Sequence, residues 1–239
     1  SNYGRMSAVS AFAAVLPLVI WTGFRGNVGD TALYKAFFHA MPGNLSGIAG
    51  YMETVSKDQT FFVCSALIKT VIGNHVQIYF MILAAVQAFF VFRFFRKYST
   101  DFVICYFLFI ASTDYISWMF NGIRQFTAVT ITLAAFSFAM DKKYFRAIII
   151  IIFAAFFHMS ALLMIPFIFL CQGKAWNAKT LLWIFFVIMA ILFVDRFTSV
   201  LEYLLADTQY ENVVEDWVSW ADNGTSPIRA LVYSMPMVI

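Results

Sequence analysis

The sequence predicts an all-α integral membrane protein: a polytopic helical bundle with re-entrant or broken helices and a long outward loop. Two observations predict this class. Of the 239 residues, 62% are hydrophobic and only 12% are charged, whereas soluble domains have about 45–50% apolar and about 25% charged residues. Apolar stretches also recur at about the 20-residue length of a bilayer crossing. These values exclude soluble globular, disordered and disulfide-scaffold proteins. The sequence also contains no polybasic tract of the kind that binds nucleic acid.

The first predicted span covers residues 6–23. Residues 24–75 then form a predicted outward loop, because they contain several glycines, a proline and the charged pair Lys57 and Asp58. Within this loop, 60–73 is apolar but too short to cross a bilayer, which favours a re-entrant or interfacial helix.

The middle of the chain predicts a further span and a helical hairpin. Residues 76–95 form the span. One helix over 102–140 would be about 58 Å long, twice the hydrocarbon thickness of about 30 Å. The chain must therefore fold back, and Asn121-Gly122 is the predicted turn between spans 102–120 and 123–140.

Residues 146–170 allow two interpretations: one tilted crossing, or two half-helices that meet near His158. The next stretch favours the broken version, because 195–222 has seven acidic residues and Arg196 as its one basic residue, as in an outward loop; the predicted outward loop covers 201–227. A span over 180–200 precedes that loop, and 228–239 begins another. We expect one transmembrane domain that is a portion of a longer chain.

The positive-inside rule orients these spans. The basic clusters at the span ends all fall on one side, which we predict to be cytoplasmic: Arg5, Arg93, Arg96, Lys97, Lys142, Lys143 and Arg146. Arg25 and Arg124 fall on the outward side, against this rule. Ionisable residues at membrane depth are costly and are therefore functional candidates.

The segment after the first span holds one group of candidates. The planar guanidinium of Arg25 suits phosphate. Asp30 and Tyr34 are four positions apart and would share one face of a helix that begins at Asp30. The alternative is that Arg25 anchors to lipid headgroups and Asp30 only caps the helix.

A polar stripe holds the second group. If helical, its members lie along one face that leads to the outward turn: Asp114, Ser117, Asn121 and Arg124. Gln125 adds an amide beside Arg124. The alternative is a structural ion pair between Asp114 and Arg124 that stabilises the hairpin.

His158 is the third candidate, followed by Ser160. Histidine is the side chain best suited to act as a general base near neutral pH, although a lone histidine in an apolar helix is often only hydrogen-bonded structure. His39 and His75 have no ligand-like spacing to it, so no metal site is predicted. The acidic loop 195–223, with Trp217 and Trp220, is either a sugar-binding surface or an ordinary interfacial loop.

Two arginines, an aspartate and a histidine near the outer face together predict an anionic, lipid-linked substrate. The arginines would hold a diphosphate, and a base would activate an acceptor hydroxyl. No cofactor is predicted.

Three stretches resemble the EpsG-type, Wzy-like bacterial exopolysaccharide and O-antigen polymerases. They occur in the family's order, with a basic Lys142-Lys143 turn between the last two. The stretches are Arg25…Asp30-Thr31…Tyr34, Gly122-Ile123-Arg124-Gln125-Phe126-Thr127-Ala128 and Phe157-His158-Met159-Ser160-Ala161-Leu162.

The resemblance implies a multi-pass protein of the bacterial inner (cytoplasmic) membrane whose active site faces outward. It would polymerise repeat units carried on undecaprenyl diphosphate, alongside chain-length regulator and flippase proteins. Arg25 and Arg124 would bind the diphosphate, with Gln125 and Tyr34 beside them. His158 would be the preferred base. The remaining implied residues are Asp30 and Asp114 as competing bases or orienting partners, and Asn121 and Ser160 in support.

Two alternatives fit the same residues. An O-antigen ligase or other lipid-carrier glycosyltransferase would use similar arginines with a different acceptor. A transporter or flippase would only bind and move an anionic lipid-linked glycan, although no inverted repeat indicates one.

Overall fold

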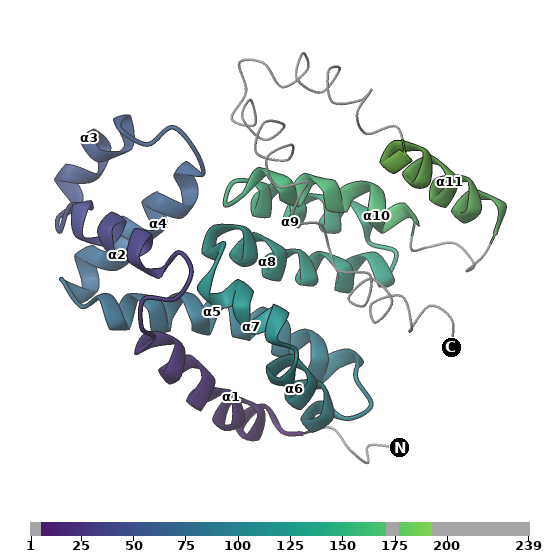
Figure 1. The fold of residues 1–239 in the computed structure, drawn as a ribbon, viewed down its shortest axis with the longest axis horizontal. Helices are drawn as coiled ribbons and strands as arrows, with labels where there is room; N and C mark the ends of the chain where they lie inside the picture. Colours follow the sequence, from purple (N-terminus) through teal and green to yellow (C-terminus); the bar gives the residue numbers. More distant parts are fainter. Residues whose placement is uncertain (1–5, 171–176, 193–239) are drawn as a thin grey trace. The chain divides into compact units, whose positions relative to one another are not determined.

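The computed structural model describes residues 6–170 and 177–192, and every regular element in these ranges is a helix (Figure 1). The chain divides into two compact units, residues 1–173 and 174–239. In the second unit the structure describes α11 (Ala178–Leu192), whose first turn is capped by Asn177. All other described helices belong to the first unit. The predicted all-helical class is confirmed over the described residues.

In the part of the chain that the structure describes, two helices are long and apolar enough to cross a membrane: α5 (Val76–Tyr98) and α8 (Ile123–Met140). They pack against each other, and α1 (Ala8–Gly23) packs along α5. A buried polar contact joins the two long helices, because the Gln87 side-chain amide donates to Thr127 Oγ1 at 2.9 Å. In a bilayer such contacts between helices replace those that water would make.

Small residues let α8 approach α9 (Tyr144–Ala155) closely. Ala135 and Ala139 on α8 and Ala147 on α9 are fully buried in one cluster with Ile151. Alanine at a helix contact allows the backbones to come near each other, which is a common basis of packing between membrane helices.

Residues 24–75, predicted as a loop with one short helix, form a compact group of helices. These are α2 (Thr31–Ala40), the 3-10 helix η1 (Leu45–Gly47), α3 (Ile48–Glu53) and α4 (Gln59–Ile72). Aromatic rings fill their core, including Tyr34, Phe38 and Phe61. The sequence did not reveal these helices because their apolar residues lie in short runs between glycines and charges.

Lys69 on α4 links that helix to the end of α2. Its side chain is only 7% exposed, and Nζ donates to the carbonyl oxygens of Phe38 at 2.7 Å, His39 at 3.1 Å and Met41 at 2.6 Å. The last carbonyls of a helix lack partners within it, and a cation near them is favourable. Lys69 therefore caps the C-terminal end of α2 from the neighbouring helix.

Replacing Lys69 with methionine is expected to lower the free energy of unfolding by about 2 kcal/mol, since hydrogen bonds to charged groups contribute about 1.5–3 kcal/mol. Thermal unfolding of the detergent-solubilised protein measures the change. Lys143→Met is the matched control, because the Lys143 side chain is about half exposed. Its Nζ atom makes a long, exposed contact of 3.6 Å with Oδ2 of Asp141. Equal melting temperatures for the two variants would contradict the capping role.

The predicted span 102–120 is broken into two helices, and residues 146–170 are broken near His158, as the favoured interpretation expected. The predicted single helix over 102–120 is two helices, α6 (Phe102–Ala111) and α7 (Thr113–Phe120), which meet at Ser112. Residues 146–170 break at His158: α9 ends at Ala155, and η2 (Met159–Leu163) and α10 (Met164–Leu170) follow. The predicted loop 201–227 and the segment 228–239 lie outside the described residues.

Candidate functional site

A buried carboxylate lies between an arginine and a histidine. The Asp58 side chain is only 6% exposed, and its Oδ2 atom is 2.9 Å from Nη1 of Arg124 and 3.1 Å from Nδ1 of His158. Tyr34 contacts Arg124 from its other side. These four residues, from four different parts of the chain, form what we call the Asp58 cluster.

The backbone of Asp58 has a left-handed conformation, with φ 52° and ψ 39°. Asp and Asn are the residues besides glycine that adopt it most readily. The Asp58 carbonyl accepts from the Phe61 amide at 2.9 Å, which begins α4. This sharp turn at the start of α4 positions the carboxylate toward α8 and the break after α9.

Arg124 lies in the first turn of α8 and is held on two sides. Its Nη1 contacts Asp58, and its Nε donates to the Tyr34 hydroxyl at 3.1 Å. The guanidinium also lies 5.5 Å from the ring centroid of Phe62. Burial raises the pKa of Tyr34, so the phenol is neutral and can accept this bond. The Arg124 side chain is still 29% exposed, which leaves part of it open to a ligand.

His158 occupies the break between α9 and η2, where its backbone is extended. The break frees the residue from helical geometry and lets its ring reach Asp58. A carboxylate at Nδ1 favours the tautomer with the proton on that nitrogen, so Nε2 is left as the basic nitrogen. The side chain is 23% exposed, which gives a ligand access to it.

Arg25 and Asp30 hold the turn that leads into Arg124. Arg25 is 6% exposed, donates from Nη1 to the Met119 carbonyl at 2.7 Å and lies 4.0 Å over the Phe80 ring. Burial lowers the pKa of Arg25 to about 10, so it remains charged at neutral pH.

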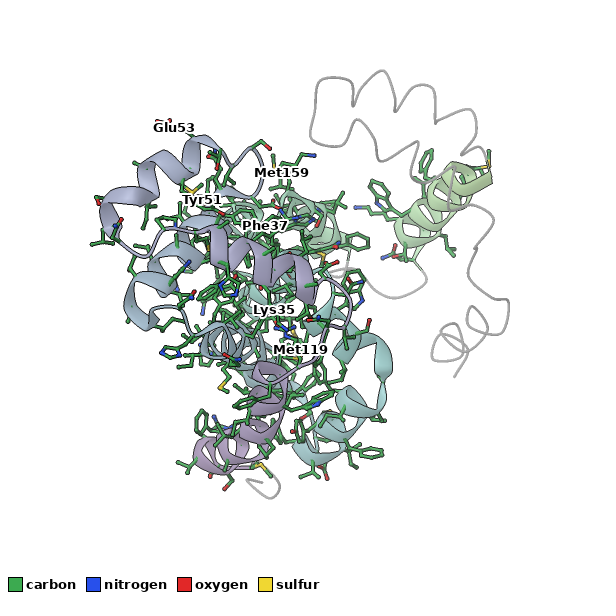
Figure 2. All side chains as sticks on the ribbon, turned by 60° about the vertical axis from the view of Figure 1, so that its left-hand side comes forward. Lys35, Phe37, Tyr51, Glu53, Met119 and Met159 are labelled. Atoms are coloured by element: carbon green, nitrogen blue, oxygen red, sulfur yellow. The ribbon has the colours of Figure 1, made fainter. Side chains whose placement is uncertain are left out.

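Asp30 Oδ2 accepts from the Gly122 amide at 2.8 Å. Figure 2 labels Met119, whose carbonyl accepts from Arg25, and Lys35 of α2, the helix that begins directly after Asp30.

The turn between α7 and α8 depends on the two residues that form it, Asn121 and Gly122. Gly122 has φ +65°, and a Cβ at this position would lie 2.9 Å from a ring atom of Trp118. Asn121 contributes as well: with its amide nitrogen facing Asp30, that nitrogen lies 2.9 Å from Oδ1 of Asp30. Asp30 thus contacts two successive residues just before Arg124.

The structure brings together three predicted residues, Tyr34, Arg124 and His158, around Asp58. The Arg25 side chain donates to the Met119 carbonyl oxygen and lies over the rings of Phe80 and Phe120. Gln125 and Ser160 are half-buried neighbours of Arg124 and His158 in the sequence.

The predicted polar stripe is not one helix face. α7 ends at Phe120, and α8 begins at Ile123 after the left-handed Gly122, so Asp114 and Ser117 belong to a different helix from Arg124. The structure gives Arg124 an ion pair with Asp58. The side chain of Asp114 and the acidic loop 195–223 lie outside what the structure describes.

Asp58 was missed as a site residue because its charge was interpreted only as a mark of a loop. One local signal was available: a carboxylate directly before an apolar helix in an outward segment. Its partners are distant in the sequence, so no periodic pattern connects them. Among the described residues, no group of three or more His, Cys, Asp or Glu side chains is arranged to hold a metal ion.

No curated protein and no solved structure matches the chain. The EpsG family model matches residues 9–237, which confirms the resemblance seen in the three sequence stretches. The chain therefore belongs to the EpsG family.

Proposed function

We propose that this protein is a membrane glycosyltransferase that polymerises oligosaccharide repeat units carried on undecaprenyl diphosphate, at the outer face of the bacterial inner membrane. The observation that carries the proposal is the Asp58 cluster. One buried carboxylate oxygen contacts both an arginine and a histidine, each still partly exposed. A site for a phosphate-bearing leaving group and a base for a hydroxyl are thereby adjacent.

Arg124 binds the diphosphate of the donor. Guanidinium groups form strong paired hydrogen bonds to phosphate oxygens, and the exposed part of Arg124 supplies the donors. Tyr34 and Asp58 fix the group before substrate arrives. Donors held in place stabilise developing negative charge without having to reorganise during the reaction.

His158 acts as the general base. The acceptor hydroxyl oxygen forms a bond to the anomeric carbon of the donor sugar, and the bond from that carbon to the diphosphate oxygen breaks. The bonding electrons leave with the diphosphate, and the hydroxyl proton moves to Nε2 of His158. Asp58 is a positioning residue that holds the ring by Nδ1 and stabilises the imidazolium that forms.

Arg25 and Asp30 are positioning residues in this proposal. Arg25 was predicted to bind the diphosphate, and Asp30 to be a competing base or an orienting partner. Their contacts with Met119 and Gly122 support a role in fixing the turn before Arg124 instead. A buried arginine that donates to a helix-end carbonyl completes the protein's own structure.

Two substitutions of Asp30 separate positioning from proton transfer. Asp30→Asn is expected to keep most of the polymerisation rate, because its amide oxygen can still accept from the Gly122 amide. Asp30→Ala leaves that amide without its partner, and we expect the rate to fall about ten-fold. Rates are measured from the length distribution of labelled glycan. A rate for Asp30→Asn as low as that for Asp30→Ala would contradict positioning and favour acid-base chemistry.

The proposed function is tested by giving the purified protein lipid-linked repeat units in liposomes and following glycan length. We expect a ladder of products and one lipid diphosphate released for each unit added. Transfer of the glycan to a different acceptor without a ladder would indicate a ligase. Movement of the lipid across the bilayer without glycan growth would indicate a transporter.

A further inference from the structure

An apolar groove runs between α1 and α5, outside the Asp58 cluster. Its volume is about 640 Å³, within the range of about 300–1,000 Å³ that is usual for ligand sites. Its walls extend from Ala8 to Val19 on α1 and from Ala85 to Arg96 on α5. The two helices lie side by side in Figure 1.

The groove has the length of one leaflet. Each wall covers a stretch of helix about 17 Å long at about 1.5 Å per residue, and half of the bilayer's hydrocarbon core is about 15 Å. The groove therefore suits a hydrocarbon chain that lies parallel to the helices and extends from the membrane surface toward the midplane.

The groove is apolar along its length and basic at one end. Phe12, Leu16 and Phe89 expose apolar surface along it, whereas Arg93 and Arg96 line its end and are exposed. Arg96 Nε donates to the Met6 carbonyl at 3.0 Å, which fixes this arginine beside the start of α1. This is the opposite end of both helices from Arg25 and the Asp58 cluster.

We propose that this groove is a binding site for an anionic phospholipid. One acyl chain occupies the apolar length of the groove, and the headgroup phosphate binds Arg93 and Arg96. Charge complementarity selects this occupant, because the groove is lined by two neighbouring arginines and by no carboxylate. Basic pockets between membrane helices recognise anionic headgroups on this principle.

The site differs from the proposed substrate site in position and in ligand. The arginine end of the groove is at the start of α1, whereas Arg25 follows the end of α1. A lipid bound here therefore contacts the protein without contacting Arg124 or His158. The proposal does not depend on the polymerase activity.

The test is native mass spectrometry of the purified full chain, titrated in detergent with palmitoyl-oleoyl phosphatidylglycerol or phosphatidylcholine. We expect phosphatidylglycerol to bind more tightly to the wild-type protein. Because a basic residue near an anionic lipid contributes about a five-fold difference in affinity, Arg93→Gln and Arg96→Gln should each weaken binding about five-fold, and the double variant about thirty-fold. Arg146→Gln, an exposed arginine on α9 that does not line the groove, is the matched control and should change nothing.

A second variant tests the apolar part. Ala85→Phe places a ring in the groove from an exposed position and keeps both arginines, so it should weaken phosphatidylglycerol binding. A phosphatidylglycerol with a photoreactive acyl chain should label peptides from α1 and α5 in the wild-type protein. Equal affinity for the two lipids, equal effects of Arg96→Gln and Arg146→Gln, or labelling confined to other helices would each overturn the proposal.

Discussion

Replacing Arg124 with alanine is expected to lower the rate of glycan polymerisation about 10²–10³-fold, the usual effect of removing one fixed donor to developing charge. The guanidinium is held by Asp58 and Tyr34 while 29% of the side chain stays exposed. Its loss removes the group that stabilises the leaving diphosphate. The rate is measured from the release of lipid diphosphate in the reconstituted reaction.

Two further variants sharpen this prediction. Arg124→Lys keeps the charge but loses the planar fork, so it should recover only part of the rate. Arg146→Ala removes an exposed arginine from α9 and should leave the rate unchanged. A rate for Arg124→Ala within the range of the Arg146→Ala control would exclude Arg124 from the diphosphate site.

Replacing His158 with alanine is expected to lower polymerisation about 10²–10⁴-fold, the range for loss of a general base. The ring is held by Asp58 through Nδ1, and its removal leaves the acceptor hydroxyl without a proton acceptor. Binding of the donor should persist, because Arg124 keeps its contact with Asp58. Single-turnover kinetics with saturating donor separate the loss of chemistry from any loss of binding.

His75→Ala is the matched histidine control, because His75 is exposed at the start of α5. The effects of Arg124→Ala and His158→Ala should not add, since both residues contact the same carboxylate oxygen and act as one unit. Undiminished chemistry in His158→Ala would eliminate this residue as the base.

The helical class was predictable from composition because burial in lipid requires satisfied backbone groups. Length and hydropathy located the two long helices, with ends close to those predicted. The helices of 24–75 were not predictable in the same way. Their packing depends on contacts such as Lys69 with the end of α2, and neither partner is distinctive alone.

The site was predictable in part. Arg124 and His158 stood out because charge is expensive near a membrane, and Tyr34 because of its spacing from Asp30. Arg25 stood out for the same reason as Arg124, yet it donates to a helix-end carbonyl. Sequence position shows that a charge needs a partner but does not show which partner it has. Asp58 is the clearest case, since it is a site residue because of its contacts with Arg124 and His158, which are far away in the sequence.

The most direct test of the Asp58 cluster is the polymerisation rate of Asp58→Asn. Asparagine has the same size and tolerates the left-handed backbone of this position, so the variant should fold, as thermal unfolding can verify. Asp101→Asn is the matched control, because Asp101 is an exposed N-cap and asparagine caps equally well. We expect Asp58→Asn to lose about 10²-fold in rate through misplacement of Arg124 and His158, and Asp101→Asn to retain the wild-type rate. A folded Asp58→Asn protein that polymerises at the wild-type rate would contradict the account.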